Sequence, residues 1–378
     1  MLKENNKINF ILSILLFIPT LVNISNVYYF IFLCLGILEL FKKSTFLKIN
    51  RNVILIIVVS ISILIFYSGF FFNQELIDNV QSITDFLPLS LSILACIFLA
   101  RSKYINDQVL LLISYYILIE IIVGITEYML NIHYFIRPAN DSDRIFIDND
   151  LIYYSRVYGL SSNSSALALK SFILLLLSQW LNLSKKKRAI FILAASIGIF
   201  ITFNRTALAA GLFFVFLLLL KNLKNRKIIG IAIITIAVVL FYLFENLELI
   251  ITQLNRGKDS LDISGRDVIL SEYWDFILAN PVFGNSFHSL RLPYQGYLSH
   301  SHNSFIQLLS ETGILFFLLV QFYILKNLTK NNFVYVLPIM LYSVAQHGIF
   351  WGISFLDIIF FYFLISKHQF YDKRIQEI

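Results

Sequence analysis

Apolar stretches long enough to cross a bilayer recur along almost the whole chain, and they constrain its fold more than any other feature. Mean hydropathy is +0.76, and only 14% of the residues are charged. About 20 apolar residues in a helix cross the ~30 Å hydrocarbon core, where the helix satisfies its own backbone polar groups. The sequence therefore predicts an all-α, polytopic integral membrane protein, with residues 1–378 as one membrane domain. About twelve transmembrane helices are expected, near residues 8–24, 27–41, 53–72, 86–100, 108–130, 162–181, 189–203, 207–220, 228–245, 304–325, 333–350 and 353–366.

The connecting segments fall into two alternating classes, one rich and one poor in Lys and Arg. Because Lys and Arg near span ends stay in the cytoplasm, this alternation predicts that both termini are cytoplasmic. It also explains most of the net charge of +7 without a nucleic-acid partner. The basic class contains Lys3, Lys7, Lys42, Lys43, Lys48, Arg51, Arg101, Lys103, Lys185, Lys186, Lys187, Arg188, Lys221, Lys224, Arg226, Lys227, Lys326, Lys330, Lys367, Lys373 and Arg374. The other class includes two long outer loops, residues 131–161 and 246–303.

A few basic residues fall on the predicted outer side, against the orientation bias, which indicates a positive function there. They are Arg137, Arg144, Arg156, Arg205, Arg256, Lys258, Arg266 and Arg291. Arg205 lies in Phe203-Asn204-Arg205-Thr206, the break between two apolar spans. A guanidinium there could bind a phosphate through two parallel hydrogen bonds, and this interpretation is favoured over the alternative of simple snorkelling at a tight turn.

Two further outer arginines adjoin predicted helix starts. Arg156 precedes Asn163, a residue type that favours helix caps, so it is expected near a helix N-terminus that attracts anions, or else in a surface loop. Arg266 lies in Ser264-Gly265-Arg266-Asp267, which has the spacing of a capping box. An amphipathic helix in the outer interface is predicted after it, ending at Asn280-Pro281, with Arg266 facing the polar zone or held in a loop salt bridge. Its expected apolar face comprises Val268, Ile269, Tyr273, Trp274, Ile277 and Leu278.

The run His300-Ser301-His302-Asn303 stands directly before another apolar helix. Asn303 or Ser304 is expected to cap this helix, with Gln307 completing a capping box. Imidazole titrates near neutrality, so His302 could accept a proton from a sugar hydroxyl, while His300 should face the opposite side of an extended lead-in.

The same helix carries a polar stripe formed by Ser304, Gln307 and Glu311. Because polar groups are costly in lipid, the stripe must face protein or a water-filled cavity. Glu311 is expected to orient one of the histidines or to pair an arginine, although interhelical hydrogen bonding alone would also explain the stripe.

Metal binding is the alternative use of two close histidines. The sequence has no HExxH motif and no cysteine cluster, and the spacing of Asp141, Asp143, Asp148 and Asp150 specifies no site. Neither a metal nor a cofactor is predicted.

A series of short motifs in residues 150–325 resembles the O-antigen ligase and polymerase superfamily. The motifs are, in order, Arg156 with Gly159 and Asn163, Asn204-Arg205-Thr206-Ala207, Gly265-Arg266, Asn280-Pro281-Val282-Phe283-Gly284, His302-Asn303 and Glu311-x-Gly313. The resemblance implies a multi-spanning glycosyltransferase of the C-type that uses undecaprenyl-diphosphate-linked glycans without a metal. It also implies the bacterial inner (cytoplasmic) membrane, with the active site on the outer, periplasmic face.

Carried over by position, Arg205 and Arg266 would bind the lipid diphosphate, with Arg156 as a third arginine. His302 would be the general base, and His300 is a second candidate base. The implied partners are an undecaprenyl-diphosphate-linked oligosaccharide, the lipid bilayer and a chain-length regulator.

The favoured function is a polymerase of O-antigen, capsule or exopolysaccharide repeat units, which transfers the glycan onto a sugar hydroxyl of another lipid-linked repeat unit. The alternative is an O-antigen ligase that transfers the glycan to lipid A-core. A multi-spanning lipid or glycan transporter is the second alternative, because ionisable residues in apolar segments can mark transport paths. Those residues are Glu120, Glu127, Lys170, Glu311, His347 and Asp357.

Overall fold

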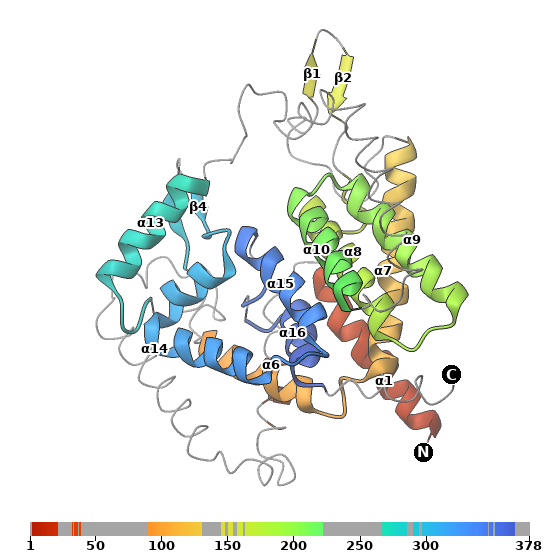
Figure 1. Ribbon diagram of the computed structural model, residues 1–378, viewed down its shortest axis with the longest axis horizontal. Helices are drawn as coiled ribbons and strands as arrows, with labels where there is room; N and C mark the ends of the chain where they lie inside the picture. Colours follow the sequence, from red (N-terminus) through yellow and green to blue (C-terminus); the bar gives the residue numbers. More distant parts are fainter. Residues whose placement is uncertain are drawn as a thin grey trace. The chain divides into compact units, whose positions relative to one another are not determined.

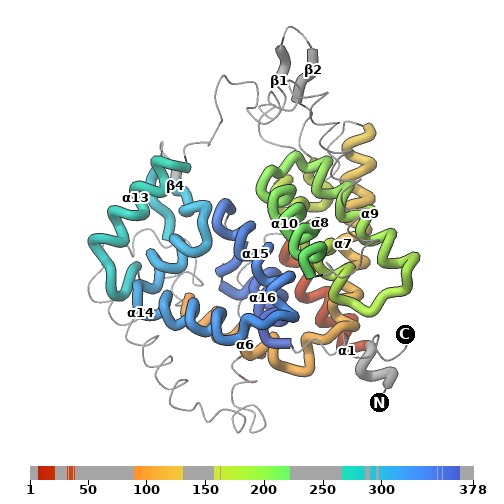
Figure 2. Tube along the Cα trace, in the orientation of Figure 1, coloured from red at the N-terminus to blue at the C-terminus, as the bar shows by residue number. Residues whose placement is uncertain are grey.

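A computed structural model describes about three fifths of the chain, and the tube in Figure 2 is coloured along most of this part. It covers residues 2–21, 32, 34–36, 38, 89–130, 145–147, 150–153, 157–161, 163–221, 266–285, 290–294, 297–346, 348–350 and 352–366, with only the backbone at 2–6, at 145–153 and at 297. The chain forms two compact units. One combines residues 1–113 with 266–378, and the other consists of residues 114–265.

Helices dominate the described part of both units (Figure 1). The first unit contains α1 (Leu2–Phe17), a 3-10 turn (Ile18–Thr20), α6 (Leu89–Arg101), α13 (Arg266–Ala279), α14 (Ser304–Asn327), α15 (Phe333–Ala345) and α16 (Phe355–Ile365). The second contains α8 (Ser164–Trp180), α9 (Lys185–Ile201), α10 (Arg205–Lys221) and most of α7 (Asp107–Leu130).

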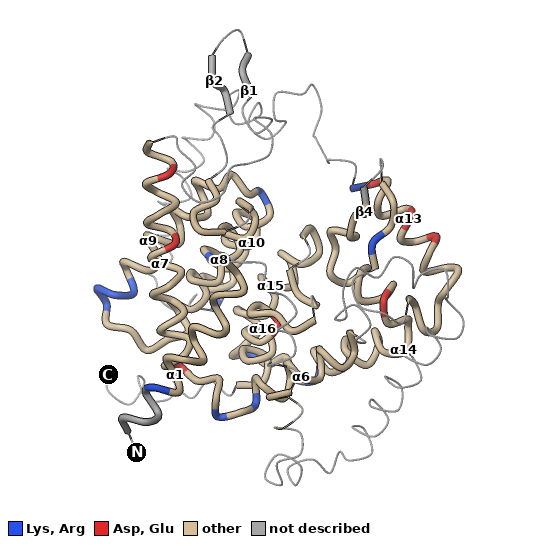
Figure 3. The backbone as a smooth tube through the Cα atoms, turned by 180° about the vertical axis from the view of Figure 1, so that it is seen from behind, with Lys and Arg blue, Asp and Glu red and all other residues tan. Residues whose placement is uncertain are grey.

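The described helices coincide with most of the apolar stretches in the sequence. α7 and α14 are long and apolar enough to cross a membrane, judged by length and composition, and five shorter helices are apolar as well. Large side chains on α9 and α10 are strongly exposed, including Leu193 (63%), Phe200 (64%) and Leu212 (61%). Exposed apolar surface of this kind favours a lipid environment. The basic residues at the start of α9 form a continuous blue stretch in Figure 3, as expected for a span end.

Some predicted elements lie outside the described residues, among them the spans at 53–72 and 228–245, most of 27–41, and the cap residues Ser264 and Gly265. The count of twelve spans and the cytoplasmic termini therefore stay predictions.

Two short antiparallel hairpins, which the all-helical prediction did not include, lie in the two loops expected to face outward. β1 (Ile145–Ile147) pairs with β2 (Asp150–Tyr153), and β3 (Leu292–Tyr294) pairs with β4 (Tyr297–Ser299). β4 leads directly into His300. The second hairpin therefore sets the direction from which the histidine segment approaches α14.

α14 is not the continuous span that its apolar sequence predicts, because the helical backbone is interrupted at Gly313 (φ 71°, ψ 176°). The turn after α13 docks against this break. The Ile314 amide donates to the Pro281 carbonyl (2.9 Å), and the Asn285 amide donates to the Ser310 carbonyl (2.7 Å). These bonds replace intrahelical bonds that the break removes, so α14 consists of a short first half that ends at Thr312 and a longer second half.

α13 buries one side of its predicted apolar face and exposes the other. Ile269 and Tyr273 form a small core with Leu290, against which Leu292 and Ile306 pack. Val268, Trp274 and Leu278, expected on the same face, are 46%, 49% and 74% exposed. The prediction of a single apolar face is therefore wrong, because the hairpin and the first half of α14 cover only the stripe through Ile269, Tyr273 and Ile277.

Candidate active site

The two histidines before α14 lie together, with ring centroids 4.3 Å apart. The prediction that His300 faces away from His302 is wrong, because His302 adopts a left-handed backbone (φ 54°) that an extended lead-in would not contain. Ser301 stabilises this turn. Its hydroxyl donates to the Asn303 carbonyl (2.7 Å) and accepts from the Asn303 amide (3.2 Å). The segment thus presents two imidazoles as one pair.

Asn303 is the N-cap of α14, and its side chain accepts hydrogen bonds from the Phe305 and Ile306 amides. Gln307 does not complete a capping box; its side-chain oxygen Oε1 accepts from the Ser301 amide (2.9 Å). The Ser304 hydroxyl accepts from the amides of Gly348 (2.9 Å) and Ile349 (3.1 Å). The start of α14 is therefore fixed both to the histidine segment and to the loop after α15.

Glu311 acts on the loop that leads to the histidines. One of its oxygens accepts hydrogen bonds from the Leu290 amide (3.0 Å) and from the Gln307 side chain (2.6 Å). Gln307 also donates to the Leu290 carbonyl (2.7 Å), as does the Tyr273 hydroxyl (2.7 Å). Ser304, Gln307 and Glu311 are all buried, which confirms that the polar stripe faces protein.

Tyr273 extends this network to α13. Its hydroxyl also donates to the carbonyl of Ser299, the residue before His300 (3.1 Å). Burial, followed by the charge of Glu311, raises the pKa of the Tyr273 hydroxyl above its usual range, so it stays a donor. The network holds both ends of the residue 290–301 loop against α13 and α14.

Arg266, the first residue of α13, is held beside the C-terminus of α15. Its guanidinium donates to the Ala345 carbonyl (2.7 Å) and to the Gln346 side chain (3.1 Å). A helix C-terminus attracts a cation, so this location is favourable. The contacts hold the guanidinium in the same region as the histidines, and the charge of Arg266 lowers the pKa of both imidazoles.

Both imidazoles are held in the neutral form. Burial, followed by the charge of Arg266, lowers the pKa of His302 to about 4. Burial lowers the pKa of His300 to about 4 as well, with smaller effects from His302, Arg291 and Arg266. Nδ1 of His302 is buried and has no hydrogen-bond partner among the described residues. Because a buried polar atom without a partner costs about 1–3 kcal/mol, this nitrogen suits a bound ligand or water.

Arg205 is the first residue of α10, directly after a tight turn in which Phe203 has a positive φ of 48°. Asn204 caps the helix by accepting from the Ala207 amide (2.9 Å), and its amide group donates to the Ser165 hydroxyl (3.1 Å) at the start of α8. Asn163 is the N-cap of α8, as its residue type predicts. Two helix N-termini thus lie side by side next to Arg205, an arrangement that favours an anion.

The predicted site residues are distributed over the two units. His300, His302, Arg266 and Glu311 come together in the first unit, whereas Arg205 lies in the second. Arg156 lies outside the described residues.

One functional candidate was missed by the sequence reasoning. Arg291 directly follows Leu290, whose backbone is bound by Glu311 and Gln307, and its charge contributes to the lowered pKa of His300. Its predicted position on the outer side, against the charge bias, was the available signal, but nothing in the sequence connected it to the histidines.

A comparison with known protein families finds a match in the region that contains these residues. Residues 189–320 match the model of the O-antigen ligase family. No curated protein matches the chain closely enough to count as a relative. The matched residues include Arg205, Arg266, both histidines and Glu311, and the match supports glycan transfer of the ligase or polymerase type. The chain therefore carries, over residues 189–320, a region similar to the O-antigen ligase domain.

Proposed function

We propose that the protein polymerises O-antigen, capsule or exopolysaccharide repeat units on the outer face of a bacterial inner membrane. It would transfer a glycan from undecaprenyl diphosphate to a sugar hydroxyl of another lipid-linked repeat unit, without a metal. The observation that carries the proposal is the neutral His300–His302 pair beside Arg266, within the matched domain. A neutral imidazole can accept a proton, and a guanidinium can stabilise an anionic leaving group.

The reaction needs little more than positioning and one base. His302 takes the proton from the acceptor hydroxyl while the hydroxyl oxygen attacks the anomeric carbon of the donor. The bond between this carbon and the diphosphate oxygen breaks, and undecaprenyl diphosphate leaves with its electron pair. Arg205, Arg266 and Arg156 stabilise the charge of the diphosphate. Direct attack inverts the anomeric centre, and His302 then releases its proton to water.

The contacts within the first unit support the proposed orientation. Arg101 at the end of α6 donates to the hydroxyl of Tyr323 near the end of α14 (3.0 Å), and both positions adjoin loops predicted to be cytoplasmic. Ser304 and Arg266, predicted to be outside, instead bind residues at the predicted outer end of the span at 333–350, next to the outer segment expected at 348–352. In each case, the hydrogen bond joins two helix ends that the charge pattern assigns to the same side of the membrane.

The described contacts weaken the transporter alternative. Glu120 and Lys170 form a buried ion pair, Glu127 accepts from the amides of Tyr158 and Gly159, and Asp357 accepts from the Phe350 amide. These groups have structural partners, so a transport path is not needed to explain their burial. His347 lies outside the described residues. The matched family is described as an O-antigen ligase, but the donor chemistry is common to both reactions, so the match supports the ligase alternative as well as the polymerase.

Purified protein supplied with undecaprenyl-diphosphate-linked repeat units alone tests the proposal. A polymerase produces a ladder of chain lengths from this single substrate. Product that forms only after lipid A-core is added would establish the ligase instead. Movement of the lipid-linked glycan between leaflets without a new glycosidic bond would establish a transporter.

Arg205→Lys is expected to weaken donor binding about tenfold, although the charge is retained. Lysine cannot reproduce the two parallel hydrogen bonds of a guanidinium, and the lost bond corresponds to about 1.4 kcal/mol. Affinity for undecaprenyl diphosphate, measured in detergent, checks this result. Lys221→Arg at the opposite end of α10 serves as the control and should bind as the unaltered protein does. Equal affinities for the Arg205→Lys variant and the unaltered protein would remove Arg205 from the diphosphate site.

The pH dependence should reflect the neutral histidines. Since the pKa of His302 is about 4, kcat/KM should stay flat from about pH 6 to 8 and fall as the pH approaches 4. The pKa of each histidine in the folded protein lies below the unfolded value of about 6.5, so the unfolded chain takes up protons first as the pH falls. The contribution of the histidines to the free energy of unfolding is therefore fully present above about pH 6.5 and is lost as the pH falls from about 6.5 to about 4. Diphosphate bound near Arg266 should shift the acid limb of kcat to higher pH. An acid limb of kcat/KM near 6.5 would contradict this environment.

A further inference from the structure

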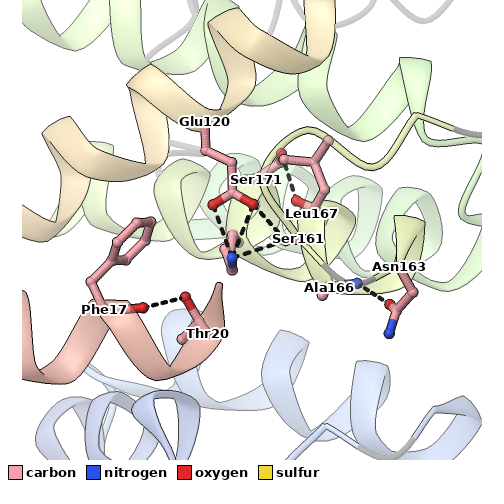
Figure 4. A network of polar contacts seen from close by, with 9 residues as sticks. Phe17, Thr20, Glu120, Ser161, Asn163, Ala166, Leu167 and Ser171 are labelled. Carbon is pink, nitrogen blue, oxygen red and sulfur yellow. Dashed lines mark hydrogen bonds and ion pairs between the residues drawn. The ribbon is translucent and has the colours of Figure 1, made fainter. Parts of the chain in front are cut away.

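The second unit contains a buried polar cluster that the proposed reaction does not use. Lys170 on α8 donates to both carboxylate oxygens of Glu120 on α7 (3.0 and 2.9 Å) and to the Ser161 hydroxyl (2.9 Å). The Ser161 hydroxyl also donates to Glu120. All three residues are at most 3% exposed. Figure 4 shows the Glu120 carboxylate pointing toward Ser161, which lies just before the start of α8.

The cluster fixes the segment that enters α8. Ser161 lies two residues before the N-cap Asn163, and its amide donates to the Tyr158 carbonyl (3.0 Å). Upstream, Glu127 accepts from the amides of Tyr158 (3.1 Å) and Gly159 (2.6 Å). Two buried carboxylates of α7 therefore hold both ends of residues 158–161. Desolvating an ion pair brings little or no net stability, so burial of this one calls for another explanation.

The start of α8 is in turn connected to Arg205. Ser165, four residues after Ser161, accepts a hydrogen bond from Asn204, which caps α10 and precedes Arg205. We propose that Glu120, Lys170 and Ser161 form a positioning cluster that aligns the N-termini of α8 and α10, and with them Arg205, for the diphosphate of the donor. This inference rests on the proposed function, because it assigns the ligand of Arg205.

Ser161→Ala tests the inference with a small change. The substitution removes the hydrogen bonds that join the Ser161 hydroxyl to Glu120 and Lys170, while the ion pair between these two residues remains. Ser171→Ala is the matched control, since Ser171 is equally buried on α8 but its hydroxyl donates to Leu167 of the same helix. We expect about tenfold weaker binding of undecaprenyl diphosphate for Ser161→Ala and unchanged binding for Ser171→Ala, with KM for the donor raised and kcat little changed.

Combination with Arg205→Ala separates positioning from general stability. If Ser161 acts through Arg205, the double variant binds no more weakly than Arg205→Ala alone. A paired Glu120→Gln/Lys170→Met variant, which leaves no unpaired buried charge, should show the same dependence on Arg205. Additive losses, or normal binding by folded Ser161→Ala, would overturn the inference alone. Failure of the unaltered protein to bind undecaprenyl diphosphate would overturn the proposed function together with it.

Discussion

Replacement of His302 by asparagine is expected to lower kcat by about 10²- to 10⁴-fold, the usual contribution of a general base. This loss corresponds to about 3–5 kcal/mol of transition-state stabilisation. Asparagine is the suitable replacement because His302 has a φ of 54°, and asparagine tolerates a left-handed backbone better than alanine does. Its side chain cannot accept the proton of the acceptor hydroxyl. The turn should therefore survive while the chemistry does not.

The measurement is single-turnover glycan transfer, with donor affinity determined separately. Donor binding should stay within a few fold of normal, because the imidazole contributes no positive charge at neutral pH. His300→Asn is the control. The imidazole lies 4.3 Å from that of His302 and shares its environment, so a general loss of structure should affect both variants alike. Normal turnover by His302→Asn would rule out this residue as the base, and a larger loss for His300→Asn would transfer the role to His300.

Local sequence signals predicted many helix boundaries well. α7 spans 107–130 against a predicted 108–130, and Asn163 and Asn303 both cap the helices that follow them. These features depend on apolar runs and on the capping preference of asparagine, both of which act over a few residues. A helix after Gly265 was predicted for the same reason, although its apolar face was not, and its described part begins at Arg266.

Features that depend on distant residues were not predictable in this way. Glu120 and Lys170 are separated by 50 positions, and each alone appeared as an isolated charge in an apolar segment. The left-handed conformation of His302 depends on contacts of Ser301 and Gln307, so an assumed extended lead-in placed His300 wrongly. Gln307 likewise matched a capping box by spacing, but Asn303 is the cap, and the Gln307 side chain binds elsewhere.

The break in α14 shows the same limit at a single residue. The sequence after Gly313 is apolar, and the predicted span of residues 304–325 runs through this position without a break. The reason lies about thirty residues earlier, in the turn after Pro281. A Cβ on Gly313 would overlap the Val282 carbonyl and would lie 2.6 Å from the Phe283 nitrogen. Gly284, on the facing turn, is packed just as tightly against the break, since a Cβ added there would lie 2.8 Å from the Gly313 nitrogen.

Gly313→Ala is accordingly expected to destabilise the fold by about 3 kcal/mol or more. The backbone at φ 71° and ψ 176° is essentially restricted to glycine, and the added methyl group meets backbone atoms that cannot rotate away. To accommodate it, the turn must move off the break, which loses the bonds of Ile314 to Pro281 and of Asn285 to Ser310. Because the first half of α14 carries Gln307 and Glu311, the loop bearing the histidines should loosen as well.

The thermal midpoint of the detergent-solubilised protein measures this effect, with glycan transfer as the second readout. Gly211→Ala is the matched control. Gly211 lies inside α10, where a Cβ would meet Ile199 and Leu175 at ordinary distances of 3.6 and 3.7 Å. Alanine also has the higher helix propensity, by about 1 kcal/mol, so this variant should be as stable as the unaltered protein or slightly more so. Equal midpoints for the two variants would show that the turn and the break do not depend on each other, and the positioning of the histidine loop would then need another cause.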